Sequence, residues 1–273
     1  MINKDTKLCI SIAEKPSNFG STIFNNAFQF LALDYVYKPF CVLVKDLPQA
    51  IQGIKALGIR GCGVSMPHKI KVLKYLDKVD KVAKKIGAVN TIVNKKGKLI
   101  GYNTDYIGAK RALEENYNVR NKKVLLIGAG GVARAIIVAL IKLGAGSIFI
   151  ANRDNQKAKL LAKRFKLNFC NFSEVNNFRG DLLINATSVG MSPNKQEMII
   201  NKQSIKHYEV IMDVVIALEM SALIKASKSM KKNIIIGAQM SMYQAASQFE
   251  LYTGKKAPFK VIKQSIKEYL KLI

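Results

Sequence analysis

The segment KVLLIGAGGVARAIIVALIKLG, residues 123–144, decides the fold class of this chain of 273 residues. Its first part, Val124 to Ile127, is a short apolar run that is typical of a buried strand, and a long apolar helical pattern follows the glycines. The residues between them, Gly128 to Ala133, match the pattern G-x-G-x-x-A. Because a strand precedes these glycines and a helix follows them, the segment predicts the turn that holds the pyrophosphate of a dinucleotide.

Each small residue of this turn has a structural reason. Gly128 permits the tight turn, Gly130 lets a pyrophosphate approach the backbone, and Ala133 keeps the helix close to the strand. Free N–H groups at the start of the helix attract the anion. The alternative is a glycine-rich turn without a ligand. The candidate cofactor-binding residues here are Gly128, Ala129, Gly130, Gly131 and Val132.

The end of the next expected strand, SIFIAN, indicates which dinucleotide is bound. Enzymes that use NAD place an acidic residue about 20 residues after the glycines, where it binds the ribose hydroxyls. This chain has Asn152 followed by Arg153, and an arginine suits the extra 2′-phosphate of NADP. Lys157, one helical turn later, adds a second cation, whereas Asp154 would repel a phosphate if it pointed inward. The pattern favours NADP over NAD.

Two series of strands and helices divide the chain. The first predicts strands at 8–12, 35–40 and 61–66 and helices at about 21–33 and 46–57. This order predicts a mostly parallel sheet. A hairpin with Lys96-Gly97 at its tip is expected next, and Asn103 to Asp105 open a helix.

The second series begins with residues 123–144 and continues through SIFIAN, DLLINA, VIMDVV and NIIIGA. These continuous apolar strands are expected when helices cover both faces of a parallel sheet. Residues 238–273 have a helical pattern and contain no strand. The fold class that we expect is therefore α/β with two domains.

Charge and composition limit the partners. The chain has 44 Lys and Arg against 18 Asp and Glu, a net charge of +26, so nucleic acid is an alternative partner. The lysines are scattered, and no basic stripe alternates with aromatic residues for base stacking. We therefore expect no specific nucleic-acid binding, but a basic surface that attracts anionic ligands. The sequence leaves open whether the chain forms a homodimer.

The four cysteines lie far apart without a C-x-x-C pair, and their neighbours predict buried, reduced thiols. No metal site is expected. There is no apolar run of about 18 residues, and the N-terminus lacks the apolar stretch of a signal peptide. These observations predict a soluble, cytoplasmic protein without a membrane segment.

Polar groups recur where the strands of the first series end. Lys69 follows the strand at 61–66, at a strand-to-helix turn whose side chains reach a crevice above a parallel sheet. A lysine can polarise a carbonyl oxygen and donate a proton to it, and a carboxylate such as Asp105 can orient that lysine. The alternatives are a solvated lysine and an Asp105 that only caps a helix, which Asn103 or Thr104 could also do. His68 is expected to be structural.

The ordered motifs V-S-M-P-H-K, G-A-V-N-T, G-Y-N-T-D, G-A-G-G-V-A, N-R-D, N-A-T-S-V-G-M and Q-A-A-S-Q-F-E-L-Y-T-G resemble those of the shikimate dehydrogenase family and span almost the whole chain. The resemblance implies an N-terminal α/β substrate domain with a parallel-rich sheet, residues 1–103 completed by helices in 238–273. It also implies a Rossmann-like NADP-binding domain, residues 104–237.

The resemblance also implies roles for single residues. Lys69 and Asp105 would be the catalytic pair, and Ser65, Asn90 and Gln244 would bind a small cyclic hydroxy-carboxylate. Gly237 and Met240 would border the nicotinamide, and Thr187 and Val214 are further cofactor-binding candidates. The implied reaction is the reversible, NADPH-dependent reduction of 3-dehydroshikimate to shikimate, in the synthesis of chorismate and the aromatic amino acids.

Two departures from the family pattern affect the substrate site. Members carry a Ser-x-Ser pair that binds the substrate carboxylate, and here Asn18 and Gly20 take those positions. Asn18, Ser21 or Thr22 can substitute, because amide and hydroxyl donors at a helix start suit an anion. Ile216 replaces a usual tyrosine.

The segment P-S-N-F-G is similar to that of the shikimate dehydrogenase-like subgroup. The alternatives are therefore a paralogue that acts on quinate or another cyclic hydroxy acid, and a catalytically silent NADP-binding regulator.

Overall fold

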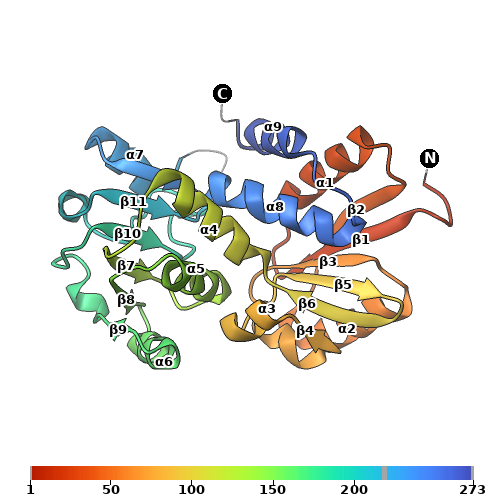
Figure 1. Ribbon diagram of the computed structural model, residues 1–273, viewed down its shortest axis with the longest axis horizontal. Coiled ribbons are helices and arrows are strands. Elements are labelled where there is room, and N and C mark those ends of the chain that lie inside the picture. Colours follow the sequence, from red (N-terminus) through yellow and green to blue (C-terminus); the bar gives the residue numbers. More distant parts are fainter. Residues whose placement is uncertain (1, 193, 217–219, 272–273) are drawn as a thin grey trace. The chain divides into compact units, whose positions relative to one another are not determined.

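The computed structural model describes residues 2–192, 194–216 and 220–271, and the chain divides into two compact units (Figure 1). Unit 1 contains residues 2–107 and returns with Met242–Tyr269, whereas unit 2 contains Gly108–Ser241. Two helices carry the chain from one unit into the other: α4, Thr104–Asn116, and α8, Gly237–Thr253. The C-terminal residues without a strand therefore complete the N-terminal unit.

Unit 1 is built on a six-stranded sheet in the order β2-β1-β3-β5-β6-β4. Parallel pairs join β1 to β2, β1 to β3 and β4 to β6, and antiparallel pairs join β3 to β5 and β5 to β6. The sheet is thus mixed, because the predicted hairpin extends it. The strands are β1 (Lys7–Ala13), β2 (Tyr35–Cys41), β3 (Gly61–Val64), β4 (Lys78–Val79), β5 (Thr91–Lys95) and β6 (Lys98–Tyr102).

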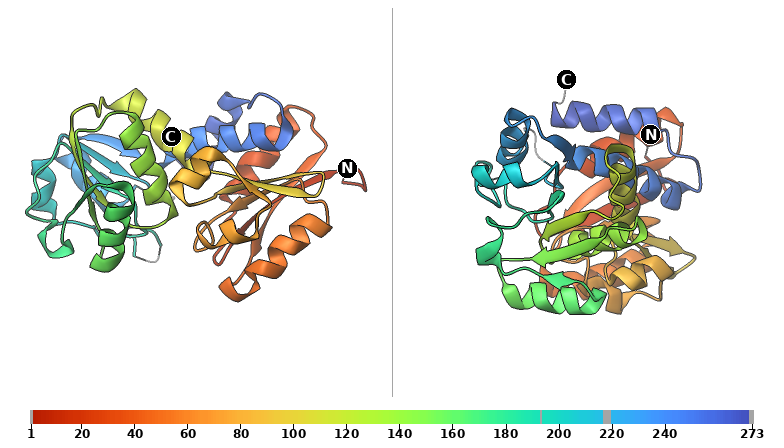
Figure 2. Two further views of the ribbon diagram at one scale, coloured as in Figure 1. Left: turned by 60° about the horizontal axis from the view of Figure 1, so that its bottom comes forward. Right: turned by 60° about the vertical axis from the view of Figure 1, so that its left-hand side comes forward.

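Helices cover both faces of this sheet. Ile10 and Ile12 of β1 pack with Ile51 of α2 (Leu47–Ala56) in one buried cluster. On the other face, Phe24 of α1 (Phe19–Phe30) contacts the ring of Tyr252 of α8. The left view of Figure 2 shows α2 and α8 on opposite sides of the sheet. The remaining helices of the unit are α3 (Lys81–Ile86) and α9 (Phe259–Leu270).

The predicted hairpin tip is confirmed. Lys96 and Gly97 connect β5 to β6 with φ angles of 53° and 83°. Two successive positive φ angles match the twist of the flanking strands in a two-residue turn.

Unit 2 contains a second sheet, whose six strands are all parallel in the order β12-β11-β10-β7-β8-β9. From the central β7 the chain first moves outward through β8 and β9, and it then returns to the other side of β7 for β10, β11 and β12. This reversal of strand order beside β7 defines a Rossmann-like sheet, and ligands bind at the carboxyl ends of the strands next to such a point.

The strands of unit 2 agree with the predicted apolar runs, apart from the two-residue β9. They are β7 (Lys123–Ile127), β8 (Ser147–Ala151), β9 (Asn168–Phe169), β10 (Leu182–Asn185), β11 (Val210–Asp213) and β12 (Asn233–Ile236). Its helices, besides parts of α4 and α8, are α5 (Gly131–Lys142), α6 (Asn155–Phe165) and α7 (Ala222–Ser229).

The prediction of four buried cysteines is correct for three of them. All four thiols are free, and Cys9, Cys62 and Cys170 are buried. Cys41 is exposed, because it ends β2, which lies at the edge of its sheet. The exposure of Cys41 is thus determined by its position on an edge strand and not by its apolar neighbours in the sequence.

We expect Gly61→Ala to lower the free energy of unfolding by about 1–3 kcal/mol. A Cβ atom at Gly61 would lie 2.2 Å from Cδ1 of Tyr252, a side chain that is fully buried, so the ring cannot move aside freely. The matched control is Gly53→Ala on α2, where a Cβ atom meets nothing within 4 Å. That change should raise stability by about 0.5–1 kcal/mol, since glycine is unfavourable inside a helix. Urea unfolding measures both, and equal stability of the two variants would contradict the expectation.

Candidate active site

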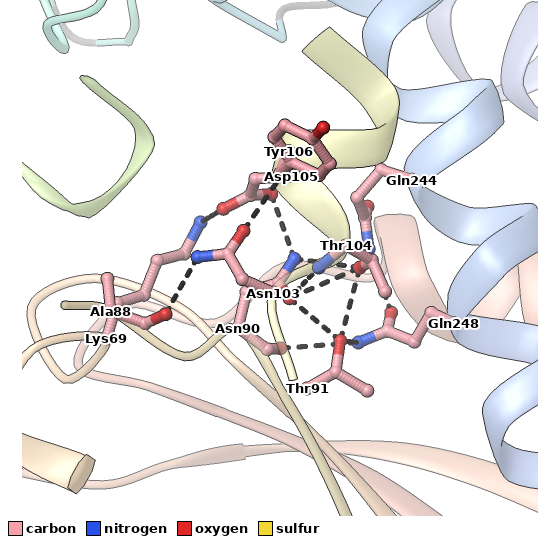
Figure 3. A network of polar contacts seen from close by, with 10 residues as sticks. All are labelled: Lys69, Ala88, Asn90, Thr91, Asn103, Thr104, Asp105, Tyr106, Gln244 and Gln248. Carbon is pink, nitrogen blue, oxygen red and sulfur yellow. Dashed lines mark hydrogen bonds and ion pairs between the residues drawn. The ribbon is translucent and has the colours of Figure 1, made fainter. Parts of the chain in front are cut away.

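Lys69 and Asp105, the predicted catalytic pair, are in direct contact. Lys69 lies on the turn after β3, and Asp105 lies in the first turn of α4. The Nζ atom of Lys69 donates to Oδ2 of Asp105 at 2.6 Å, as Figure 3 shows. The two side chains are only 13% and 8% exposed. The pair is therefore a partly buried ion pair, and the alternative of a freely solvated lysine is wrong.

Asp105 does not cap its helix. The Oδ1 atom of Asn103 accepts a hydrogen bond from the backbone N–H of Tyr106 at 3.2 Å, which is the bond of a helix cap. Asn103 also donates to the backbone oxygen of Ala88 at 2.9 Å, which ties the start of α4 to the segment before β5. Because Asn103 supplies the cap, the carboxylate of Asp105 is available for Lys69.

Asn90 holds the second oxygen of that carboxylate. The backbone N–H of Thr104 donates to Oδ1 of Asn90 at 2.7 Å, so this atom must be the oxygen. The Nδ2 atom of Asn90 then donates to Oδ1 of Asp105 at 2.9 Å and to the hydroxyl of Thr104 at 3.0 Å. Asn90 is 3% exposed. Asp105 thus has one donor on each oxygen and is held in one orientation.

A cavity of about 170 Å³ opens beside this pair, entirely within unit 1. Of the residues predicted for catalysis and substrate binding, Ser65, Lys69, Asn90, Asp105 and Gln244 line it. Its lining combines hydroxyl, amide and charged groups with apolar surface from α1 and α8. This composition suits a small polar ligand with a hydrocarbon ring.

Asn18, the remaining predicted substrate-binding residue, is exposed and is not part of the lining. The hydroxyls of Ser21 and Thr22, its alternatives, donate to the backbone oxygen of Asn18 at 2.9 and 3.0 Å. At this end of the cavity the lining includes Lys15 and Ser17 instead. Lys15 forms no ion pair or hydrogen bond within the described ranges of the chain. Its charge and its place just after β1 were the signals that could have identified it.

Tyr37 is a second lining residue that the sequence did not indicate. Its side chain is 4% exposed, and it lines the cavity together with Ser11. Burial raises the pKa of the Tyr37 hydroxyl, which therefore stays protonated and able to donate. A Cβ atom at Gly63 would lie 2.8 Å from this hydroxyl, so glycine leaves the space that the tyrosine occupies.

The glycine turn of unit 2 meets the requirements of a dinucleotide site. Gly128 has a φ angle of 134°, and a Cβ atom there would lie 2.6 Å from the backbone oxygen of Ala186, so only glycine fits. At Gly130 a Cβ atom would meet nothing within 4 Å, and α5 begins at Gly131. Ala133 is fully buried. The helix start with Ala129, Gly130, Gly131 and Val132 therefore has open space for an anion.

The charged residues after β8 differ in whether they have a partner. Asp154 caps α6, because its side chain accepts from the backbone N–H groups of Gln156 and Lys157 at 3.1 and 3.2 Å. The Nζ atom of Lys157 lies 3.0 Å from Oδ2 of Asp154, and this contact lowers the pKa of the carboxyl group. The carboxylate of Asp154 is thus engaged by the start of α6 and by Lys157. Arg153 is exposed and has no partner among the described residues, while Asn152 donates to the backbone oxygen of Asp154.

The other predicted cofactor residues also lie in unit 2. The hydroxyl of Thr187 donates to Oδ1 of Asn185, the last residue of β10. A Cβ atom at Gly237 would lie 2.7 Å from the backbone oxygen of Val214, so this glycine permits close contact with the end of β11. Met240 is 5% exposed. These positions gather at the carboxyl ends of β10, β11 and β12.

His68 is structural, as expected. It is fully buried, and its Nε2 atom lies 2.8 Å from the backbone oxygen of Val42. Among the described residues, no group of three or more His, Cys, Asp or Glu side chains is placed to hold a metal ion. Over the same residues, the helices are too short or too polar to cross a membrane.

Three family models match successive parts of the chain. A shikimate dehydrogenase substrate binding domain matches residues 18–92, a shikimate / quinate 5-dehydrogenase model matches residues 109–232, and a shikimate 5′-dehydrogenase C-terminal domain matches residues 237–267.

Relatives match over nearly the whole chain. A shikimate dehydrogenase-like protein of Haemophilus influenzae is 39% identical over 97% of both chains. An NADP(+) shikimate dehydrogenase of Methanocaldococcus jannaschii is 42% identical over 97% of this chain and 98% of its own.

Solved structures agree with these relatives. A shikimate dehydrogenase in complex with NADP+ has a TM-score of 0.90 at 39% identity and covers 99% of this chain and 98% of its own. A shikimate 5-dehydrogenase of Listeria monocytogenes in complex with shikimate and NAD has a TM-score of 0.85 at 33% identity, over 96% of this chain and 97% of its own.

The fold and the site thus define a two-domain α/β protein with a substrate unit and a Rossmann-like unit. The chain belongs to the shikimate dehydrogenase family, and its likeness to the Haemophilus protein supports the shikimate dehydrogenase-like subgroup.

Proposed function

We propose that this chain is an NADP-dependent oxidoreductase that interconverts 3-dehydroshikimate and shikimate. The observation that carries the proposal is the partly buried Lys69–Asp105 pair beside a small polar cavity. Relatives at about 40% identity that bear the name shikimate dehydrogenase (NADP(+)) support the same conclusion and favour shikimate over quinate.

Proton transfer is the part of the reaction that we assign to Lys69. NADPH, when bound, supplies the hydride that adds to the carbonyl carbon. The ammonium of Lys69 polarises the carbonyl oxygen and donates a proton to it, and in the reverse direction the amine removes the proton of the hydroxyl. One proton of the ammonium is engaged by Asp105, so the others are available to the substrate. Asp105 thus orients the ammonium and can accept from a neighbouring hydroxyl.

For the cofactor, we propose that the start of α5 binds the pyrophosphate and that Arg153 binds the 2′-phosphate. The open space at Gly130 and the guanidinium of Arg153, which is unpaired among the described residues, support these roles. Lys157, Asn152, Thr187, Val214, Gly237 and Met240 remain proposed cofactor contacts.

A spectrophotometric assay with shikimate and NADP tests the proposal directly. We expect turnover with this pair and weaker turnover with quinate or NAD. A chain that binds NADP but turns over neither shikimate nor quinate would instead be a silent NADP-binding regulator. Turnover that favours quinate would identify a paralogue with another substrate.

We expect Lys15→Met to raise KM for shikimate by roughly three- to tenfold with little change in kcat, as loss of one accessible ion pair predicts. The reason is that Lys15, unpaired in the part of the chain that the structure describes, offers the cavity a cation near the positions where the family has hydroxyl groups. The control is Lys38→Met, an exposed lysine of β2 outside the cavity lining. The methyl ester of shikimate lacks the carboxylate charge, so KM for the ester should differ little between wild type and Lys15→Met. If KM rises equally for acid and ester, Lys15 does not bind the carboxylate.

Cytoplasmic localisation remains a prediction, and assembly into a homodimer is a hypothesis that the sequence leaves open. A supply of NADPH in the cytoplasm supports the first, and cell fractionation measures it. Sedimentation velocity measures the second.

A further inference from the structure

Gln248 of α8 is a buried amide that has no role in the proposed reaction. It is 4% exposed. Its Nε2 atom donates to the hydroxyl of Thr91 at 2.9 Å and to the backbone oxygen of Asn90 at 3.3 Å (Figure 3). A backbone oxygen can only accept, so the nitrogen of Gln248 must face it. The oxygen Oε1 of Gln248 consequently faces the other way.

That oxygen determines the orientation of Gln244, one helical turn earlier. The Nε2 atom of Gln244 donates to Oε1 of Gln248 at 3.1 Å and to the hydroxyl of Thr104 at 3.1 Å. Both N–H groups of Gln244 are therefore engaged. Its own Oε1 atom accepts no hydrogen bond from the residues that the structure describes, and Gln244 lines the cavity.

The side chain of Thr104 is also held by hydrogen bonds with Asn90. Its hydroxyl accepts from Nδ2 of Asn90 at 3.0 Å, and the backbone N–H of the same threonine fixes the oxygen of that asparagine. The hydrogen-bond chain from Gln248 through Gln244 to Thr104 thus ends on backbone groups on both sides. A half-turn of either glutamine amide would place two acceptors or two donors against each other, which leaves buried polar groups unpaired.

We propose that Gln248 is a positioning residue that fixes the polarity of Gln244, so that this wall of the cavity offers an acceptor only. The wall then binds a ring hydroxyl, which donates, and disfavours an ether or carbonyl oxygen in the same place. This inference rests on the proposed function and narrows it, since the ligand must present a hydroxyl here. Without Gln248, the amide of Gln244 is free to rotate and to offer a donor instead.

The first test compares shikimate with two analogues, each of which lacks one of the two ring hydroxyls that do not react. For one analogue, we expect wild-type kcat/KM to fall by at least about tenfold, because a site built for a hydroxyl rejects a ligand without it. In Gln248→Met and in Gln244→Met this penalty should fall below about threefold. The double variant should equal either single variant, because both changes remove one coupled interaction. If Gln248→Met loses as much kcat/KM on this analogue as wild type does, the inference is overturned. It is also overturned if the effects of the two single changes multiply in the double variant.

A purely structural role for Gln248 predicts a different result. Loss of stability alone would lower kcat/KM for shikimate and its analogues alike and leave their ratio unchanged. The matched control is Ser265→Ala, which removes another hydrogen bond of unit 1, in which the buried hydroxyl of Ser265 accepts from Nδ2 of Asn26 at 3.0 Å. We expect this variant to have a lower Tm and the wild-type penalty.

A ligand-free measurement separates this inference from the proposed function. Nuclear magnetic resonance of the Gln244 side-chain amide, assigned by its loss in Gln244→Met, should show slow exchange with water in wild type and in Ser265→Ala. In Gln248→Met the exchange should be at least about tenfold faster, since one of two hydrogen bonds is lost. Unchanged exchange would overturn the inference even if shikimate is turned over. Absence of turnover would overturn the proposed function and leave this measurement to decide the role of Gln248.

Discussion

Lys69→Ala is expected to lower kcat for shikimate by about 10²- to 10⁴-fold, the usual contribution of a positioned proton donor. The alanine removes the only group that we place at the reacting oxygen and leaves the carboxylate of Asp105 without its cation. The dissociation constant for NADP should stay within about twofold of wild type, because the proposed cofactor residues all lie in unit 2. Steady-state kinetics and calorimetric titration with NADP measure the two quantities.

The control for this experiment is Lys71→Ala, which removes an exposed lysine only two positions away. It should retain wild-type kcat and Tm, so that a loss in Lys69→Ala cannot be attributed to the lower positive charge of this turn. If Lys69→Ala keeps wild-type kcat, Lys69 has no part in proton transfer. Weaker NADP binding without a change in kcat would instead assign Lys69 to the cofactor.

The fold could be predicted where the pattern of single segments is strong. The parallel strands of unit 2 are continuous apolar runs, and Gly97 in the Lys96-Gly97 turn suits a positive φ angle. The two-residue strands β4 and β9 are too short to carry a pattern, so the sequence did not indicate them. A resemblance, and not periodicity, indicated that the C-terminal helices complete unit 1.

The site could be predicted less completely, because it depends on contacts between distant segments. Lys69 and Asp105 are far apart in the sequence, and only the family motifs suggested that they meet. Lys15 and Tyr37 face the cavity through the geometry of β1 and β2, which no local pattern reveals. Gln248 did carry a signal, since it lies four residues after Gln244 and therefore on the same helix face.

The cofactor preference follows from how the charges after β8 are arranged. Asp154 was the residue that opposed NADP in the sequence, and its engagement in the cap of α6 directs its carboxylate to backbone N–H groups and to Lys157. The ion pair with Lys157 is exposed, so it is weak and does not prevent the ammonium from binding a phosphate. Arg153 is the cation without a competing carboxylate among the described residues.

We therefore expect Arg153→Ala to lower kcat/KM for NADP by about ten- to a hundredfold, which corresponds to a charge-assisted hydrogen bond of about 1.5–3 kcal/mol. The planar guanidinium can donate two N–H groups to the 2′-phosphate, which NAD lacks. The value of kcat/KM for NAD should change by less than about threefold. The control is Arg179→Ala, an exposed arginine of the same unit, which should leave the ratio of the two cofactors unchanged. Equal losses for NADP and NAD would show that Arg153 does not bind the 2′-phosphate, and Asp154 would then be the candidate ligand for the ribose hydroxyls of NAD.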